Sequence, residues 1–133
     1  MALVEFHLDP SSGVSYYVQL IQQVRQALLV GILKAGDQLP TVKEVVAHVA
    51  LNPNTVLRAY RELEHDGLVV SRPGVGTFIT ANVPEALAPA SYDSLKADLE
   101  RVIDKARTYG VDDRRLAALV AHVLRENAEE DIA

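Results

Sequence analysis

Residues 41–79 read TVKEVVAHVALNPNTVLRAYRELEHDGLVVSRPGVGTFI, and this stretch decides the fold. Thr41, followed three residues later by Glu44, forms a capping box that starts a short helix with a valine-rich face. Asn52-Pro53 then ends that helix and starts another, because asparagine suits the N-cap and proline suits the first helical position. The stretch therefore predicts two helices joined by a tight turn.

After the second of these helices, the spacing of the apolar residues changes from a helical pattern to a strand-like one. The apolar residues of this helix recur at helical spacing until Gly67, which suits a left-handed C-cap. Two short β-prone runs, 68–70 and 77–79, then flank the glycine-rich segment 72–76. This pattern is typical of a β-hairpin with a tight tip.

One amphipathic helix precedes this stretch and two follow it, separated by Gly110. Residues 81–90 are rich in alanine and proline and predict a linker. We therefore expect a mainly α fold with a small β-hairpin. Residues 1–80 would form a winged helix-turn-helix domain, and residues 91–133 an α-helical hairpin.

The composition excludes several classes of protein. The 133 residues are 49% hydrophobic and 23% charged, as expected for a chain that folds around a core, and none is cysteine. Disulfides, zinc–thiolate sites and thiol nucleophiles are therefore excluded. The longest apolar run, residues 27–33, is far shorter than the ~18 residues that span a bilayer. The N-terminus also lacks the basic region of a secretory signal, so we expect a cytoplasmic protein without a membrane partner.

No group of residues points to catalysis. The four histidines show neither i,i+4 nor HExxH spacing, and Gly74-Val75-Gly76 lies between two strands, which is the wrong context for a nucleotide loop. We expect no enzyme activity, no catalytic residue, no metal and no cofactor.

The polar face of the helix after Asn52 is the strongest functional feature. Arginine can pair with guanine edges or phosphates, asparagine can read adenine, and the free N–H groups of a helix start favour phosphate. Any amphipathic helix has a polar outer face, so the hairpin directly after it is what favours double-stranded DNA as the partner. The contacts predicted on this helix are Asn52, Asn54, Thr55, Arg58 and Arg61.

The hairpin tip supplies two further candidates, Arg72 and Gly74. As a wing, the tip would bring backbone N–H groups and one arginine close to DNA; as a plain turn, it would need glycine only for its backbone conformation. The net charge of −5 at first argues against DNA. However, residues 1–80 hold 6 basic and 7 acidic side chains, so most of the acidity lies in the C-terminal part.

The last two helices carry apolar stripes too large for one thin helical hairpin to cover. Packing on the winged domain or on a second copy would bury them, and the linker favours the second copy. The predicted dimerisation residues are Leu95, Leu99, Val102, Ile103, Leu116, Leu119, Val120 and Val123.

An ordered set of motifs over about residues 9–80 resembles the GntR family of bacterial transcription regulators. The motifs are Tyr17-x-Gln19-Leu20-Ile21, Gly31-x-Leu33-x-x-Gly36-x-x-Leu39-Pro40-Thr41, Asn54-Thr55-Val56, Leu63-x-x-x-Gly67 and Gly74-x-Gly76-Thr77-Phe78-Ile79. The short C-terminal part resembles the YtrA-like branch, which implies a homodimeric repressor, often encoded beside ABC-transporter genes. The resemblance also places Lys43 where the family usually has an arginine that contacts DNA; lysine keeps the charge but lacks the bidentate fork.

Together these features predict a homodimeric repressor that binds a pseudo-palindromic operator and controls a transporter operon. The alternative is a winged-helix module that binds a protein or ligand and not DNA. If a small-molecule effector exists, the C-terminal part is too short for a ligand domain of its own. We would then expect the effector to bind between the domains or at the dimer seam.

Overall fold

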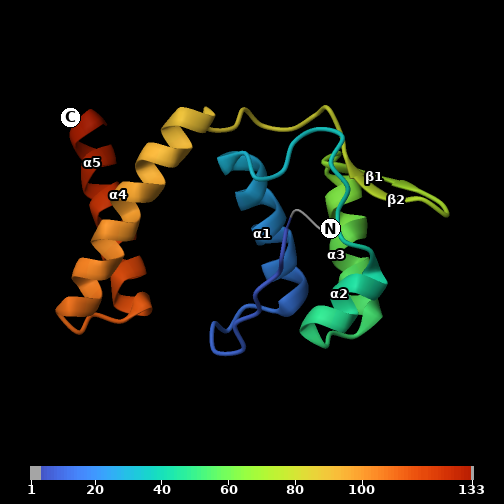
Figure 1. Cartoon of the computed structure of the whole chain (residues 1–133), viewed down its shortest axis with the longest axis horizontal. Helices are drawn as coiled ribbons and strands as arrows, with labels where there is room; N and C mark the ends of the chain where they lie inside the picture. Colours follow the sequence, from blue (N-terminus) through green and yellow to red (C-terminus); the bar gives the residue numbers. More distant parts are fainter. Residues whose placement is uncertain (1–3, 133) are drawn as a thin grey trace. The chain divides into compact units, whose positions relative to one another are not determined.

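A computed structural model describes residues 4–132 of the chain, with side chains described for residues 4–129. These residues form five helices and one antiparallel hairpin (Figure 1), which confirms the predicted mainly α fold. The chain divides into two compact units, Met1–Pro89 and Ala90–Ala133. The elements are α1 (Tyr16–Val30), α2 (Val42–Val49), α3 (Pro53–His65), β1 (Val69–Arg72), β2 (Gly76–Ile79), α4 (Pro89–Thr108) and α5 (Asp113–Ile132).

The helix-turn-helix is fixed by two local caps. The Thr41 hydroxyl accepts a hydrogen bond from the Glu44 N–H (3.1 Å), and the Glu44 carboxylate accepts one from the Thr41 N–H (3.2 Å). After α2, Ala50 adopts a left-handed conformation, and the Asn52 side chain caps α3 by accepting from the Asn54 N–H (2.9 Å). The predicted capping box and tight turn are confirmed.

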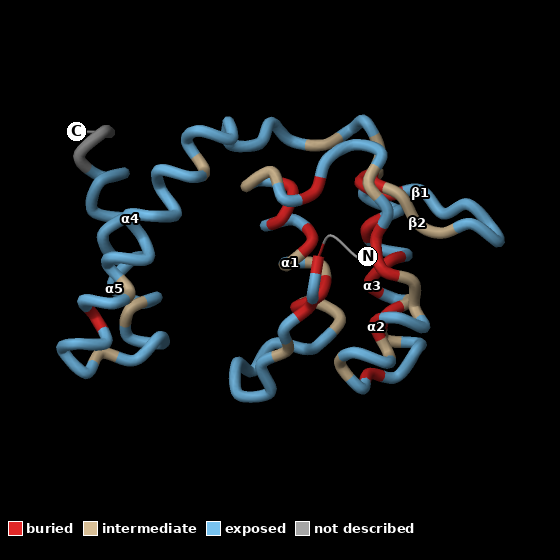
Figure 2. The backbone as a smooth tube through the Cα atoms, viewed as in Figure 1, coloured by how far each residue is buried: buried red, intermediate tan, exposed pale blue. Residues whose placement is uncertain are grey.

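The core of the first unit lies where α3 packs on α1. Leu20 and Val24 of α1 and Val56 and Leu63 of α3 are fully buried. Figure 2 shows buried residues along both helices. Each such side chain contributes about 1.5–3 kcal/mol through burial, so this contact fixes the direction of α3.

Tyr60 joins this core to the start of α2. Its buried hydroxyl donates a hydrogen bond to the Pro40 carbonyl oxygen (2.6 Å). Burial, reinforced by the negative charge of Glu44, raises the pKa of the Tyr60 hydroxyl above its ordinary value. The folded protein therefore keeps this proton at pH values where the unfolded chain loses it.

We expect the free energy of unfolding to fall as the pH rises above about 10, the ordinary pKa of tyrosine. Below that pH the Tyr60 hydroxyl is protonated in both the folded and the unfolded chain, so its contribution to stability is fully present. Above that pH only the unfolded chain releases the proton, which favours unfolding. Tyr60→Phe should remove this part of the fall and lower stability at pH 7 by about 0.5–1.5 kcal/mol. Urea unfolding at pH 7 and at high pH measures both effects. Tyr109→Phe, at a side chain 71% exposed, is the matched control and should behave as wild type.

The hairpin pairs β1 with β2 in the register Val69↔Ile79 to Arg72↔Gly76. The outer edge of β2 is covered by residues 37–39, because the Leu39 N–H donates to the Thr77 carbonyl (2.9 Å) and the Ile79 N–H to the Asp37 carbonyl (2.8 Å). β2 thus lies between β1 and residues 37–39, and these bonds hold the hairpin against the rest of the unit.

An N-terminal segment that the sequence analysis did not anticipate completes the core. Val4 and Phe6 are buried. The Gln23 side chain hydrogen-bonds both the N–H (2.9 Å) and the carbonyl oxygen (2.6 Å) of His7. The buried Gln19 side chain bonds both backbone groups of Asp9 in the same way. Two glutamines of α1 therefore hold this segment in place.

The second unit contains α4 and α5. The helix α4 begins at Pro89, inside the predicted linker, and Val83 packs against the core of the first unit. The Asp112 side chain caps α5 by accepting from the Arg115 N–H (2.8 Å). Within the described part of the chain, no helix is both long enough and apolar enough to cross a membrane.

Candidate nucleic-acid interface

The outward face of α3 presents three of the predicted residues to solvent. Asn54, Arg58 and Arg61 are exposed, whereas Val56 and Ala59 on the opposite face are fully buried. Within residues 4–129, neither Arg58 nor Arg61 forms an ion pair or a hydrogen bond. Their donor groups are therefore free to bind a ligand from outside the chain.

The two other predicted residues of α3 lie at its first turn and are less free. The Asn52 side-chain oxygen is occupied by the cap to Asn54, and Thr55 is half-buried. Lys43 is exposed on α2. Asn52 thus has a structural role that leaves only its amide nitrogen available.

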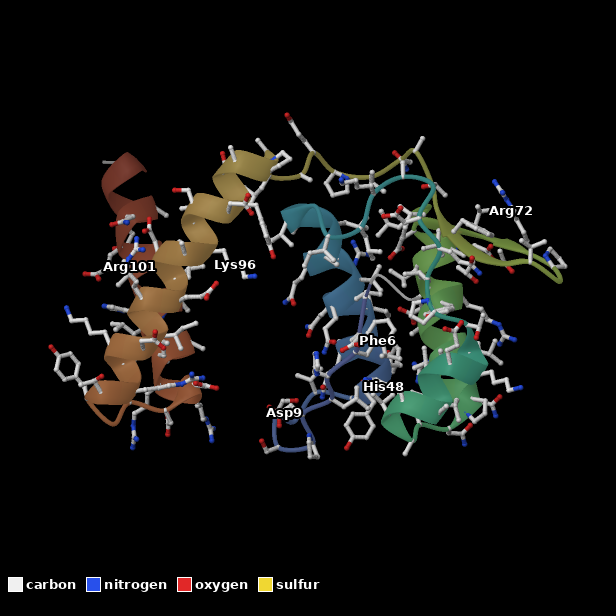
Figure 3. All side chains as sticks on the ribbon, in the orientation of Figure 1. Phe6, Asp9, His48, Arg72, Lys96 and Arg101 are labelled. Atoms are coloured by element: carbon white, nitrogen blue, oxygen red, sulfur yellow. The ribbon has the colours of Figure 1, made fainter. Side chains whose placement is uncertain are left out.

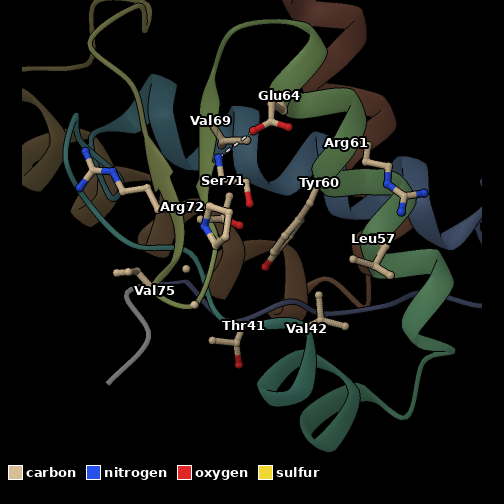
Figure 4. A pocket seen from close by; sticks show the side chains of 14 residues that line it. Thr41, Val42, Leu57, Tyr60, Arg61, Glu64, Val69, Ser71, Arg72 and Val75 are labelled. Atoms are coloured by element: carbon tan, nitrogen blue, oxygen red, sulfur yellow. Dashed lines mark hydrogen bonds between the residues drawn. The ribbon is translucent and has the colours of Figure 1, made fainter.

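A groove of about 570 Å³ runs between the start of α2, α3 and the hairpin (Figure 4). Figure 4 draws Arg61 on α3 at one side of this groove and Arg72 on the hairpin at the other. Gly74 also lines it, whereas Lys43 and Arg58 lie outside it. The structure therefore brings three predicted residues to one concave surface, with the free face of α3 beside it.

The acidic side chains near this groove are largely engaged. Glu64 accepts a hydrogen bond from the Ser71 N–H (2.7 Å), which ties the hairpin to α3. Asp66 forms an ion pair with Arg25 of α1. Within residues 4–129, the exposed charges of this surface that form neither an ion pair nor a hydrogen bond are Lys43, Arg58, Arg61 and Arg72, and one carboxylate, Glu62, which lies beside Arg58 and Arg61.

The hairpin tip is built to project backbone and one arginine. The Val75 N–H donates to the Arg72 carbonyl (3.0 Å) across Pro73-Gly74, and Gly74 has φ +76°, as the third position of a type II turn requires. The Arg72 guanidinium lies over the Phe78 ring, with Cζ 4.8 Å from the ring centroid, and Figure 3 shows Arg72 projecting from the hairpin.

Gln38 supports the tip and was missed by the sequence analysis. Its amide nitrogen donates to the Val75 carbonyl (3.3 Å), and a Cβ at Gly76 would lie 2.3 Å from that nitrogen. A side chain at position 76 would therefore displace the end of the Gln38 side chain, and the φ of +150° at Gly76 independently favours glycine. No local pattern marks Gln38, because its partner lies 37 residues further along the chain.

With this geometry established, comparison with known proteins identifies the family. The chain is 38% identical over 109 residues to the HTH-type transcriptional repressor YtrA of Bacillus subtilis (strain 168), covering 82% of this chain and 84% of that protein. The family model "Bacterial regulatory proteins, gntR family" matches residues 16–79. The chain belongs to the gntR family. The predicted resemblance to this family and to its YtrA-like branch is confirmed.

Two further comparisons support the assignment of this chain to the gntR family. It is 33% identical over 116 residues to the HTH-type transcriptional regulator Rv1152 of Mycobacterium tuberculosis, covering 87% of this chain and 91% of that protein. A solved gntR-family transcriptional regulator from Listeria monocytogenes matches with a TM-score of 0.51 and 25% identity, covering 86% of this chain and 98% of that one. The gntR family and these relatives are transcription regulators and not enzymes.

Proposed function

We propose that this protein is a sequence-specific DNA-binding repressor that acts as a homodimer on a pseudo-palindromic operator. The observation that carries the proposal is the exposed face of α3, where Arg58 and Arg61 keep free donor groups beside the groove that leads to the hairpin. The similarity to a protein named as a repressor supports the direction of regulation.

In this proposal α3 enters the major groove, which is about 12 Å wide and admits one helix. Asn54 and Arg58 read base edges, since their side chains are exposed on its outward face. Lys43, Arg61 and Arg72 position the duplex through phosphates, and the hairpin tip with Gly74 follows the neighbouring backbone. The N–H groups of Asn54 and Thr55 are already bonded to Asn52, so the Thr55 side chain and the amide nitrogen of Asn52, at the positive end of the α3 dipole, bind one further phosphate.

The second unit supplies the dimer contact. Leu99 and Val120 are 53% and 41% exposed and line an apolar groove of about 470 Å³ between α4 and α5. In the described part of this unit Ala106 is the one buried residue, so the helical hairpin alone leaves its apolar face in water. A second copy would cover such a face and would pair two DNA-reading heads about a two-fold axis.

Selection of bound sequences from a random DNA pool tests the proposal directly. We expect enrichment of two inverted half-sites whose centres lie about 10–10.5 bp, or a multiple of this, apart. Binding to the enriched duplex should weaken steeply with salt, with a linear log–log slope. A pool without enrichment, together with affinity that ignores salt, would instead favour a winged-helix module for a protein or ligand.

The similarity to the YtrA-like branch further supports a transporter operon as the target. A repressor of this kind acts in the cytoplasm, where the chromosome lies. Footprinting on the promoters beside the chain's own gene tests the target. Repeating the footprint with solutes carried by the neighbouring transporter tests for a small-molecule effector.

A further inference from the structure

Arg58 is stacked on an aromatic ring from another helix. Its Cζ lies 3.7 Å from the centroid of the Tyr17 ring, at the start of α1. A guanidinium that pointed an N–H at the ring would hold Cζ further away, so this distance indicates that the two planes lie nearly parallel. Parallel stacking uses the face of the guanidinium and leaves the N–H donors at its edge free.

Tyr17 is a firm support for this contact. It is half-buried and packs against the hydrophobic core, whereas Arg58 is exposed. Among the described residues, Arg58 has no carboxylate partner that could orient its side chain instead. The ring of Tyr17 is thus the feature of the structure that restricts where the guanidinium of Arg58 lies.

We propose that Tyr17 is a positioning residue for DNA reading: it holds the guanidinium of Arg58 with its edge toward the bases. The inference rests on the proposed function, because it needs Arg58 to contact DNA. A free arginine side chain must lose rotamer freedom before it forms two hydrogen bonds to one guanine, and the stack restricts part of that freedom before binding. Tyr17 therefore acts through Arg58 and not through a contact of its own.

Two simpler roles for Tyr17 predict different results. A hydroxyl that bound a phosphate would be lost in Tyr17→Phe, whereas the stack would survive that change. A purely structural role in the core would lower stability and weaken binding whether or not Arg58 is present. The test must therefore separate the ring from the hydroxyl, and both from packing.

The test is a double-mutant cycle in the full chain, measured by fluorescence anisotropy on the selected operator. We expect Tyr17→Leu to weaken binding about three- to tenfold, from the energy of a cation–π contact, and Tyr17→Phe to bind within about twofold of wild type. In the Arg58→Ala background Tyr17→Leu should have no further effect. Tyr16→Leu, at the exposed tyrosine beside it, is the matched control and should bind as wild type.

An NMR measurement without DNA tests the contact between Tyr17 and Arg58 separately from the proposed DNA binding. The ring current of Tyr17 should shift the Arg58 δ-methylene protons upfield in wild type and in Tyr17→Phe, and the shift should vanish in Tyr17→Leu. Thermal melting confirms that each variant folds. Equal losses for Leu and Phe at position 17, a further loss in the Arg58→Ala background, or an unshifted Arg58 would each overturn the inference. If the wild-type chain selects no DNA, the proposed function itself fails, whatever the NMR shift shows.

Discussion

Replacing Leu99 and Val120 by glutamate in the full chain is expected to produce monomers and to weaken binding to the two-half-site operator about a hundredfold or more. Two linked heads bind the second half-site as an intramolecular event, and losing that linkage removes an avidity gain of about 10²–10⁴. Sedimentation velocity measures the oligomeric state, and anisotropy on the selected operator measures the affinity.

The size of this effect follows from where the two residues lie. Both line the apolar groove of about 470 Å³ in the second unit, together with Val102, Ile103 and Leu116. A carboxylate forced into a dimer contact there would lose water without gaining a partner, which is far more unfavourable than leaving it exposed in a monomer. The monomer itself should keep its fold, because both positions are already about half exposed.

Ala97→Glu with Ala118→Glu is the matched control for this variant. Both alanines are exposed and, by the helical period, lie on the faces of α4 and α5 that point away from the apolar groove. This control adds the same charge, so it should remain a dimer. A Leu99→Glu, Val120→Glu protein that stays dimeric would show that this face is not the interface. Unchanged affinity of that variant for a single half-site would show that its DNA-reading unit is intact.

Local signals in the sequence were enough to predict the order of the elements. Thr41 and Glu44 lie in one helical turn, and Asn52 and Pro53 are adjacent, so each cap is fully specified by neighbours in the sequence. The outward direction of Arg58 followed from the helical period alone and agrees with its exposure. These features need no information from distant parts of the chain.

The contacts that complete the interface could not be predicted in this way. Gln38 contacts Val75, and Tyr17 contacts Arg58, but the residues of each pair lie far apart in the sequence and no local residue pattern links them. The N-terminal segment did leave a signal: Val4, Phe6 and Leu8 alternate with polar residues, as in a half-buried extended strand. The start of α4 at Pro89 was missed because proline occurs both in linkers and in the first turn of a helix, so Pro89 alone does not distinguish the two.

Arg58→Ala is expected to weaken operator binding by about 1–3 kcal/mol, or roughly 5- to 150-fold, and to relax base preference at one position of each half-site. The reason is that Arg58 combines an exposed position on the outward face of α3 with a guanidinium that no other charged group engages within residues 4–129. Anisotropy on the selected operator measures the affinity, and repeating the pool selection with the variant measures the base preference.

Arg58→Lys separates base reading from phosphate contact at the same position. Lysine keeps the charge but lacks the bidentate fork, so this variant should lose base preference while keeping the salt slope of wild type. Arg114→Ala, at an exposed arginine of α5, removes the same side chain outside the proposed interface and should bind as wild type. Wild-type affinity and preference in Arg58→Ala would remove Arg58 from the interface. Full activity in Arg58→Lys would instead reassign it to the phosphate backbone, beside Lys43 and Arg61.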